Sequence, residues 1–140
     1  MLLGVITALI GVIGIAVSYW FTKKQERETA LRKEKLEHYK VLIESMNGVL
    51  AGHISDEGRK TFADACNRVN LIAPQSALKA LDALLWEIDP ANPALGNGDH
   101  DALYSALMRE LRKDLHIKPK DKDLEFRFHL RSAPASDSPP

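Results

Sequence analysis

The sequence predicts an all-α protein in which an N-terminal transmembrane helix continues into a charged stalk and a small helical bundle, followed by a short strand-like arm. Three observations predict it. Residues 2–21 carry no charge, and twenty residues at ~1.5 Å each span the ~30 Å apolar core of a bilayer. Apolar residues then recur at the three- and four-residue spacing of helices. Residues 124–130 alternate instead every second residue, as strands do. We expect a transmembrane helix at 1–22, a stalk at 23–38, a helical cytosolic domain at 39–118, an arm at 119–131 and a disordered tail at 132–140.

The predicted membrane helix has one face of small and hydroxyl residues. Because an α-helix turns by about 100° per residue, their spacing of three and four places them on one side. Small residues let membrane helices approach closely, so this face indicates packing against other copies of the chain. In a wider assembly the same face would line a pore. The face comprises Gly4, Thr7, Ala8, Gly11, Gly14 and Ser18.

The residues that follow indicate the orientation of this helix. Tyr19 and Trp20 suit the headgroup level of a bilayer, and the basic residues Lys23, Lys24 and Arg27 come next. Because positive charges stay on the cytoplasmic side, we expect the N-terminus outside and the remaining chain in the cytoplasm. A cleaved signal peptide is less favoured, since its basic residues would precede a shorter apolar run.

The helix is expected to continue beyond the membrane. Residues 22–50 contain no proline, and their first glycine is Gly48. The charges of the stalk predict a solvated face. A coiled-coil stalk is the alternative, although the apolar seam from Ala30 to Leu36 is thin.

Helix-end signals divide the remaining domain into further helices. Gly52 is a candidate C-cap, Ser55 and Asp99 are candidate N-caps, and Pro74 suits a first helical position. Pro119 prevents continuation of the last helix. The predicted buried faces comprise Tyr39, Leu42, Ile43, Met46, Val49 and Leu50; Phe62, Ala65, Cys66, Val69 and Ile72; Ala77, Leu78, Leu81, Leu84, Leu85 and Ile88; and Leu103, Tyr104, Leu107, Met108, Leu111 and Leu115.

The strand-like arm has an apolar face made of Leu124, Phe126, Phe128 and Leu130. A single strand is not stable alone. The favoured interpretation is an arm that covers the apolar core of its own bundle. Pairing with a second copy or addition to a partner are the alternatives.

Composition and motifs exclude several function classes. The 19 basic and 19 acidic residues balance, which disfavours a dedicated nucleic-acid binder. We find no metal-binding, nucleophile or phosphate-loop motif, so we expect no enzymatic activity, no cofactor and no metal. The single cysteine, Cys66, excludes an intrachain disulfide, and its apolar helix face predicts a structural thiol.

Two polar clusters remain as candidate ligand or interface sites. Asparagine is unfavourable inside helices, so the first cluster indicates a kink or a buried hydrogen bond between helices, with a ligand site as the alternative. The second suits the negative end of a helix dipole, with a site for a phosphate-bearing ligand, such as a nucleotide or an anionic lipid headgroup, as the alternative. The clusters are Asn67, Arg68 and Asn70, and Arg109, Arg112 and Lys113 with Lys118 and Lys120.

Residues 66–74 (CNRVNLIAP) and 107–115 (LMRELRKDL) resemble small bacterial proteins of unknown function that have one N-terminal membrane helix, a charged stalk and a helical cytosolic domain. This architecture is similar to that of membrane effectors in bacterial antiphage systems. The resemblance implies a homo-oligomer whose cytosolic domain senses a signal. The signal would be a cytosolic protein or a nucleotide-type ligand. The oligomer would then act on membrane lipid as a pore-forming or membrane-disrupting defence effector. The alternative is a membrane-tethered adaptor that recruits a partner through the helical domain or the arm.

Overall fold

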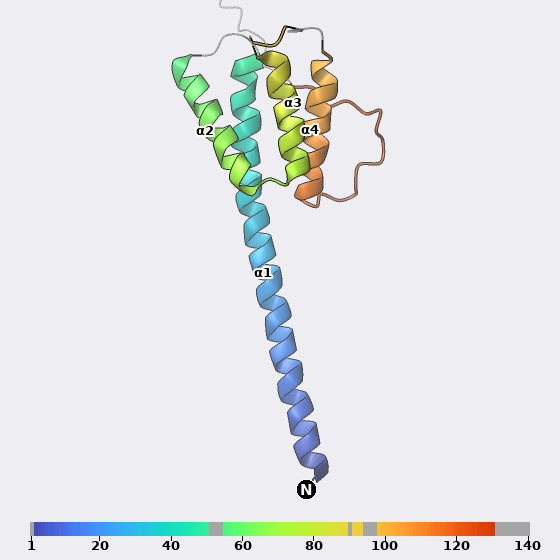
Figure 1. Cartoon of the computed structure of the whole chain (residues 1–140). Helices are drawn as coiled ribbons and strands as arrows, with labels where there is room; N and C mark the ends of the chain where they lie inside the picture. Colours follow the sequence, from blue (N-terminus) through green and yellow to red (C-terminus); the bar gives the residue numbers. More distant parts are fainter. Residues whose placement is uncertain (1, 51–54, 90, 94–97, 131–140) are drawn as a thin grey trace, which may run out of the picture. The chain divides into compact units, whose positions relative to one another are not determined.

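The protein is all-α in the part of the chain that its computed structural model describes, residues 2–50, 55–89, 91–93 and 98–130 (Figure 1). Side chains are described from residue 11 onward, Leu50 excepted. Gly52, the tail at 132–140 and the side chains of Gly4, Thr7 and Ala8 therefore lie outside the described residues. The described residues form four helices, α1 (Leu2–Leu50), α2 (Asp56–Ile72), α3 (Gln75–Ile88) and α4 (His100–Asp114), and no strand.

The chain divides into two compact units, residues 1–34 and 35–140. In the first unit every described side chain of α1 is exposed. Glu28 and Arg32 lie 3.9 Å apart as an exposed ion pair. No helix in the described part of the chain combines the length and the apolarity needed to cross a membrane.

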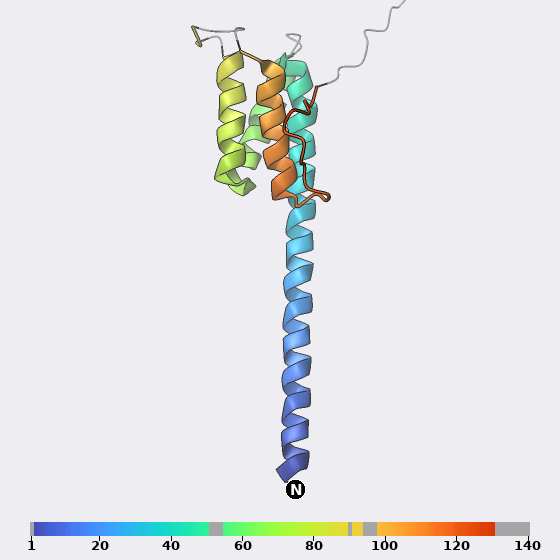
Figure 2. The same cartoon turned by 90° about the vertical axis from the view of Figure 1, so that its right-hand side faces the viewer.

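The second unit is a bundle formed by the last part of α1 with α2, α3 and α4. Each helix runs opposite to the one before it, and α3 and α4 pack closely side by side (Figures 1 and 2). The predicted apolar faces supply the core, and each helix contributes to it. Its buried members are Tyr39, Leu42, Met46, Ala65, Val69, Ala77, Leu81, Leu84, Tyr104, Leu107 and Leu111.

The helix ends largely follow the sequence signals. The Ser55 side chain accepts a hydrogen bond from the Gly58 N–H at 3.1 Å, and the Asp99 side chain accepts one from the Ala102 N–H at 3.0 Å. Both N-cap predictions are therefore confirmed. Pro74 is the N-cap of α3 and not its first residue. This difference of one position still leaves its missing N–H where no helical bond is required.

The last turn of α4 is bound to α1 through the carboxylate of Asp114. Its Oδ2 atom accepts hydrogen bonds from Lys35 Nζ at 2.9 Å and from the Tyr39 hydroxyl at 2.7 Å. The side chains of Lys35 and Asp114 are only 16% and 12% exposed. Burial, and then the hydrogen bond and charge of Asp114, hold the pKa of the Tyr39 phenol far above its usual range.

The predicted strand is wrong within the described residues, although the arm does cover the bundle. Phe128 and Leu130 pack against the core, whereas Leu124 and Phe126 are 75% and 56% exposed. Two extended residues advance ~6.6 Å and four helical residues ~6 Å. An extended segment that alternates every second residue can therefore pack along a helix as well as beside another strand.

We predict that Asp114→Ala lowers the free energy of unfolding by about 3 kcal/mol, because it leaves a buried ammonium and a phenol without their partner. Glu37→Ala is the control, since Glu37 pairs with Lys40 on an exposed surface and should contribute no more than about 1 kcal/mol. Denaturant unfolding of the full chain in uncharged detergent, followed by circular dichroism, measures both. Equal losses in the two variants would contradict the prediction.

We predict that Tyr39 makes stability fall at alkaline pH. Because the pKa of Tyr39 is raised in the folded state, its contribution is complete below the ordinary tyrosine pKa of about 10 and is lost as the pH rises further. Tyr39→Phe should cost about 1–2 kcal/mol near neutral pH, and this difference from the wild type should shrink above about pH 10. A difference that stays constant across that range in denaturant titrations would refute this assignment.

Candidate functional site

The candidate site lies where the C-terminal arm runs antiparallel along α4, next to the last part of α1 (Figure 2). Arg109 donates from Nη2 to the carbonyl oxygens of Leu124 at 2.8 Å and Phe126 at 2.6 Å. One turn earlier, Ser105 Oγ accepts from the Phe128 N–H at 2.9 Å. Side chains of α4 thus form hydrogen bonds with backbone groups of the arm that would otherwise need a neighbouring strand.

Ion pairs hold both ends of this arm. Arg127 pairs with Asp99, and His129 Nδ1 lies 2.8 Å from Asp101 Oδ2. The Ala102 N–H, and then Arg127, lower the pKa of Asp99. At the other end Arg112 contacts both carboxylate oxygens of Asp121 at 2.9 Å and lowers the pKa of that group. All these side chains are at least a quarter exposed, so water screens each pair.

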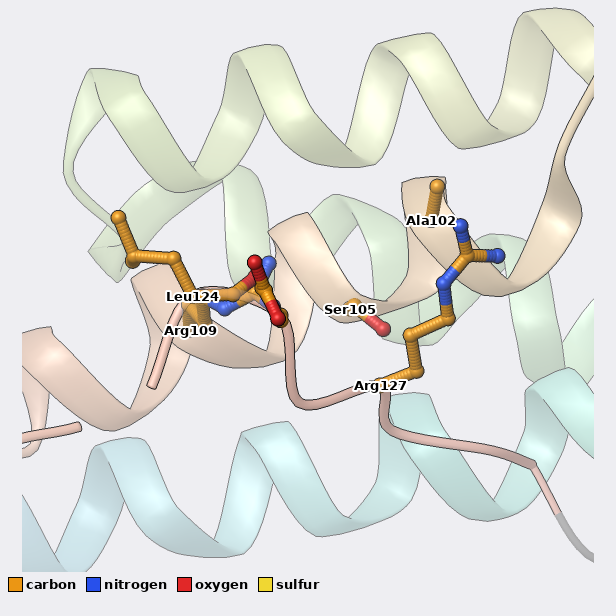
Figure 3. Close-up of a pocket in the computed structure, with 6 residues that line it drawn as sticks. Ala102, Ser105, Arg109, Leu124 and Arg127 are labelled. Carbon is orange, nitrogen blue, oxygen red and sulfur yellow. The ribbon is translucent and has the colours of Figure 1, made fainter. Parts of the chain in front are cut away.

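Two pockets flank the point at which Arg109 holds the arm. The first, of about 390 Å³, is lined by Ala102, Ser105, Arg109, Leu124, Glu125 and Arg127. Figure 3 shows Arg109 and Leu124 at one end, Ala102 and Arg127 at the other, and Ser105 between them. Because Arg109 and Ser105 already bind the backbone of the arm and Arg127 pairs with Asp99, this pocket serves mainly to seat the arm.

The second pocket, of about 430 Å³, is cationic. It lies at the end of α4 and is lined by Arg109, Glu110, Arg112, Lys113, His116, Ile117, Lys118, Lys120, Asp121 and Leu124. Five basic side chains face two acidic ones. The volume falls within the range of about 300–1,000 Å³ that is typical of small-molecule sites. The structure therefore brings together all five members of the predicted basic cluster.

The helix dipole opposes an anion at this end of α4, but the opposition is small. A helix C-terminus carries about half a negative charge, worth ~0.3–1 kcal/mol at an exposed site. His116, at φ 54°, closes the helix with a left-handed turn. The N–H groups of His116 and Ile117 then donate to the carbonyl oxygens of Lys113 and Arg112, each at 3.1 Å. The nearest carbonyl oxygens are thereby occupied.

Arg109 connects the two pockets and carries a donor that is not used. Its Nε atom is buried and has no hydrogen-bond partner among the described residues. A buried donor without an acceptor costs about 1–3 kcal/mol. Arg109 therefore binds the arm with Nη2 and leaves its buried Nε without an acceptor among the described residues.

The other predicted cluster lies elsewhere. Asn67, Arg68 and Asn70 are exposed on α2 and line neither pocket. The expectation of a buried hydrogen bond between helices is therefore wrong, because these positions face away from the apolar side of α2. Cys66 is half-buried against the core, and burial raises the pKa of its thiol, with Asp82 adding to the effect. In the described parts of the chain no group of side chains could hold a metal ion.

Among the residues that attach the arm, sequence reasoning missed Ser105 and Asp121. Ser105 sits among buried apolar positions of α4 and is itself 1% exposed, and Asp121 lies in a segment with no periodic pattern. A buried serine on an apolar helix face was the available signal for Ser105. For Asp121 the nearby arginine at residue 112 offered no distinctive spacing.

Comparisons of this chain with protein-family models, with curated proteins and with solved structures found no match.

We predict that Ser105→Ala releases the arm, since the Phe128 N–H then loses its acceptor at a cost of about 1–3 kcal/mol. Amide hydrogen exchange of Phe128 should become faster by at least about tenfold. Ser76→Ala removes an exposed hydroxyl in the first turn of α3 and serves as the control. Unchanged exchange at Phe128 in the Ser105 variant would argue against this attachment.

Proposed function

We propose that this chain is a single-pass membrane protein that assembles into homo-oligomers, and that its helical domain receives a signal and passes it to the membrane. The observation that carries the proposal is a set of large apolar side chains on α1 that no other described residue covers. They are between 48% and 73% exposed on α1. They comprise Val12, Ile13, Ile15, Val17, Tyr19, Trp20 and Phe21.

Water is a poor environment for such a segment. Burying one large apolar side chain contributes roughly 1.5–3 kcal/mol, and soluble monomers rarely expose a continuous apolar surface. The sequence extends the uncharged run back to Leu2. Lipid and other copies of the chain are the surroundings that satisfy all sides of an apolar helix of this length.

The end of the apolar run suits a membrane interface. Lys23 Nζ lies 5.9 Å from the ring centre of Tyr19, and Lys24 Nζ lies 5.6 Å from that of Trp20. Aromatic rings beside ammonium groups match the headgroup level, where both are enriched. With Lys23, Lys24 and Arg27 on the cytoplasmic side, the helical domain faces the cytoplasm of a bacterial cell.

The small face of α1 supports self-association. Apart from its chain neighbours and the nearby backbone of its own helix, a Cβ atom added at Gly11 or Gly14 would have no described atom within 4 Å. The glycines are therefore not needed for packing within one chain, and close approach of a second helix gives them a role. In an oligomer this face either closes tightly or lines a path through the membrane, as in a defence effector that acts without enzymatic chemistry.

A membrane-tethered adaptor is the second candidate. Leu71 on α2 and Trp86 on α3 are 86% and 55% exposed, and exposed apolar side chains on the helical domain favour a protein partner. The attachment of the arm to α4 makes the helices, more than the arm, the surface for such a partner.

We predict that Gly11→Leu with Gly14→Leu dissociates the oligomer. The substitutions fit the single chain but prevent close helix approach. The mass of the intact protein in lipid nanodiscs measures the assembly. Ala16→Leu is the control, because Ala16 lies on the opposite side of α1, about 140° away from Gly11 at 100° per residue.

Two outcomes separate the candidates, and two further outcomes reject parts of the proposal. Loss of both assembly and membrane activity in the glycine variant supports the oligomeric effector. Loss of assembly with partner recruitment intact supports the adaptor. A wild-type monomer in nanodiscs rejects the oligomer, and extraction of the protein by alkaline carbonate rejects the membrane helix itself.

A further inference from the structure

We propose that the cationic pocket at the end of α4 binds a phosphate-bearing small molecule, and that Asp121 of the arm competes with that molecule for Arg112. This inference rests on the proposed function for the view that the helical domain receives a signal. It names the chemical class of that signal. Its support comes from the charges, the ion pairing and the walls of the pocket.

The charges of the pocket are not balanced from within. Glu110 lies 3.5 Å from Lys113, and Asp121 pairs with Arg112. Lys118 and Lys120 are exposed and, among the described residues, have no ion-pair partner. Lysine ammonium groups donate strongly to phosphate oxygens, and a phosphate group can accept from several of them at once.

The Arg112–Asp121 pair has the form of a phosphate contact. Arg112 Nε and Nη2 donate to the two carboxylate oxygens of Asp121 at 2.9 Å each. A phosphate presents two oxygens to a guanidinium in the same way. Because the two side chains are 30% and 27% exposed, a solvent anion can reach the pair and exchange with it.

The remaining walls suit the rest of such a molecule. Ile117 and Leu124 supply apolar surface beside the basic groups, and Leu124 is 75% exposed. The side chain of Arg109 also lines this pocket. A ligand that joins a phosphate to an apolar or aromatic group fits this combination better than a bare anion does.

Binding there would act on the arm. Asp121 precedes the segment that Arg109 and Ser105 hold, so its displacement removes the first attachment of the arm to α4. The coupling is reciprocal: a variant that weakens the Asp121 contact must bind the phosphate more tightly.

The test measures pyrophosphate binding to the full chain in uncharged detergent by calorimetry. We expect saturable binding that Lys118→Gln with Lys120→Gln weakens by at least about tenfold. Asp121→Asn should strengthen binding by about fivefold, a gain that misfolding cannot produce. Lys60→Gln with Lys79→Gln removes the same charge from exposed sites on α2 and α3 and should leave the affinity unchanged.

Absence of saturable binding overturns the proposal, and so does an equal loss in the two double-lysine variants. Unchanged affinity in Asp121→Asn overturns the competition. Repeating the titration in nanodiscs of phosphatidylcholine and of phosphatidylglycerol identifies the source of the phosphate: competition by phosphatidylglycerol indicates a lipid headgroup, and its absence indicates a soluble ligand. Because calorimetry reads binding and nanodisc mass reads assembly, failure of this inference is distinct from failure of the proposed function.

Discussion

The carboxylate of Asp114 fixes the end of α4 against α1, and the site is built around that contact. Asp114 binds Lys35 and Tyr39 in partly buried surroundings, and Lys35 is the first residue of the second compact unit. Arg112 and Lys113 directly precede Asp114, and the segment 116–120, which completes the pocket, begins two residues after it. The same turn therefore anchors the bundle and presents the cations. Losing the contact would move both together, since no loop separates them.

The arm depends on α4 through a match of lengths. Arg109 donates a hydrogen bond to the carbonyl oxygen of Phe126, and Ser105 accepts one from the N–H of Phe128. Four residues of helix advance ~6 Å and two residues of extended chain advance ~6.6 Å. Side chains spaced by about one turn can thus satisfy an extended segment at every second residue. This explains why a sequence with the period of a strand forms none here, and why burial is limited to the half of its apolar face that reaches the core.

Local sequence patterns predicted the helices, but they did not predict the polar contacts between residues far apart in the chain. The buried faces and the caps at Ser55 and Asp99 follow from periodicity and from side chains that bond within three residues. The basic cluster was also visible, because its members lie within twelve residues of one another. The Asp114–Lys35 contact joins positions 79 residues apart, and nothing in either local sequence indicates the other. Asn67 and Asn70 show the converse error, since helix propensity alone does not reveal which side of a helix is buried.

The core and the C-terminal arm differ in how strongly they are held, and this difference indicates where a signal acts. The core is made of fully buried apolar side chains whose disruption costs several kcal/mol each. The arm is held at its ends by ion pairs that water screens and that contribute little to stability, with Ser105 and Arg109 between them. A ligand of ordinary affinity can overcome contacts of the second kind but not of the first. The bundle is therefore a rigid support, and the arm, attached beside a cationic pocket, is the part whose equilibrium a small anion can shift.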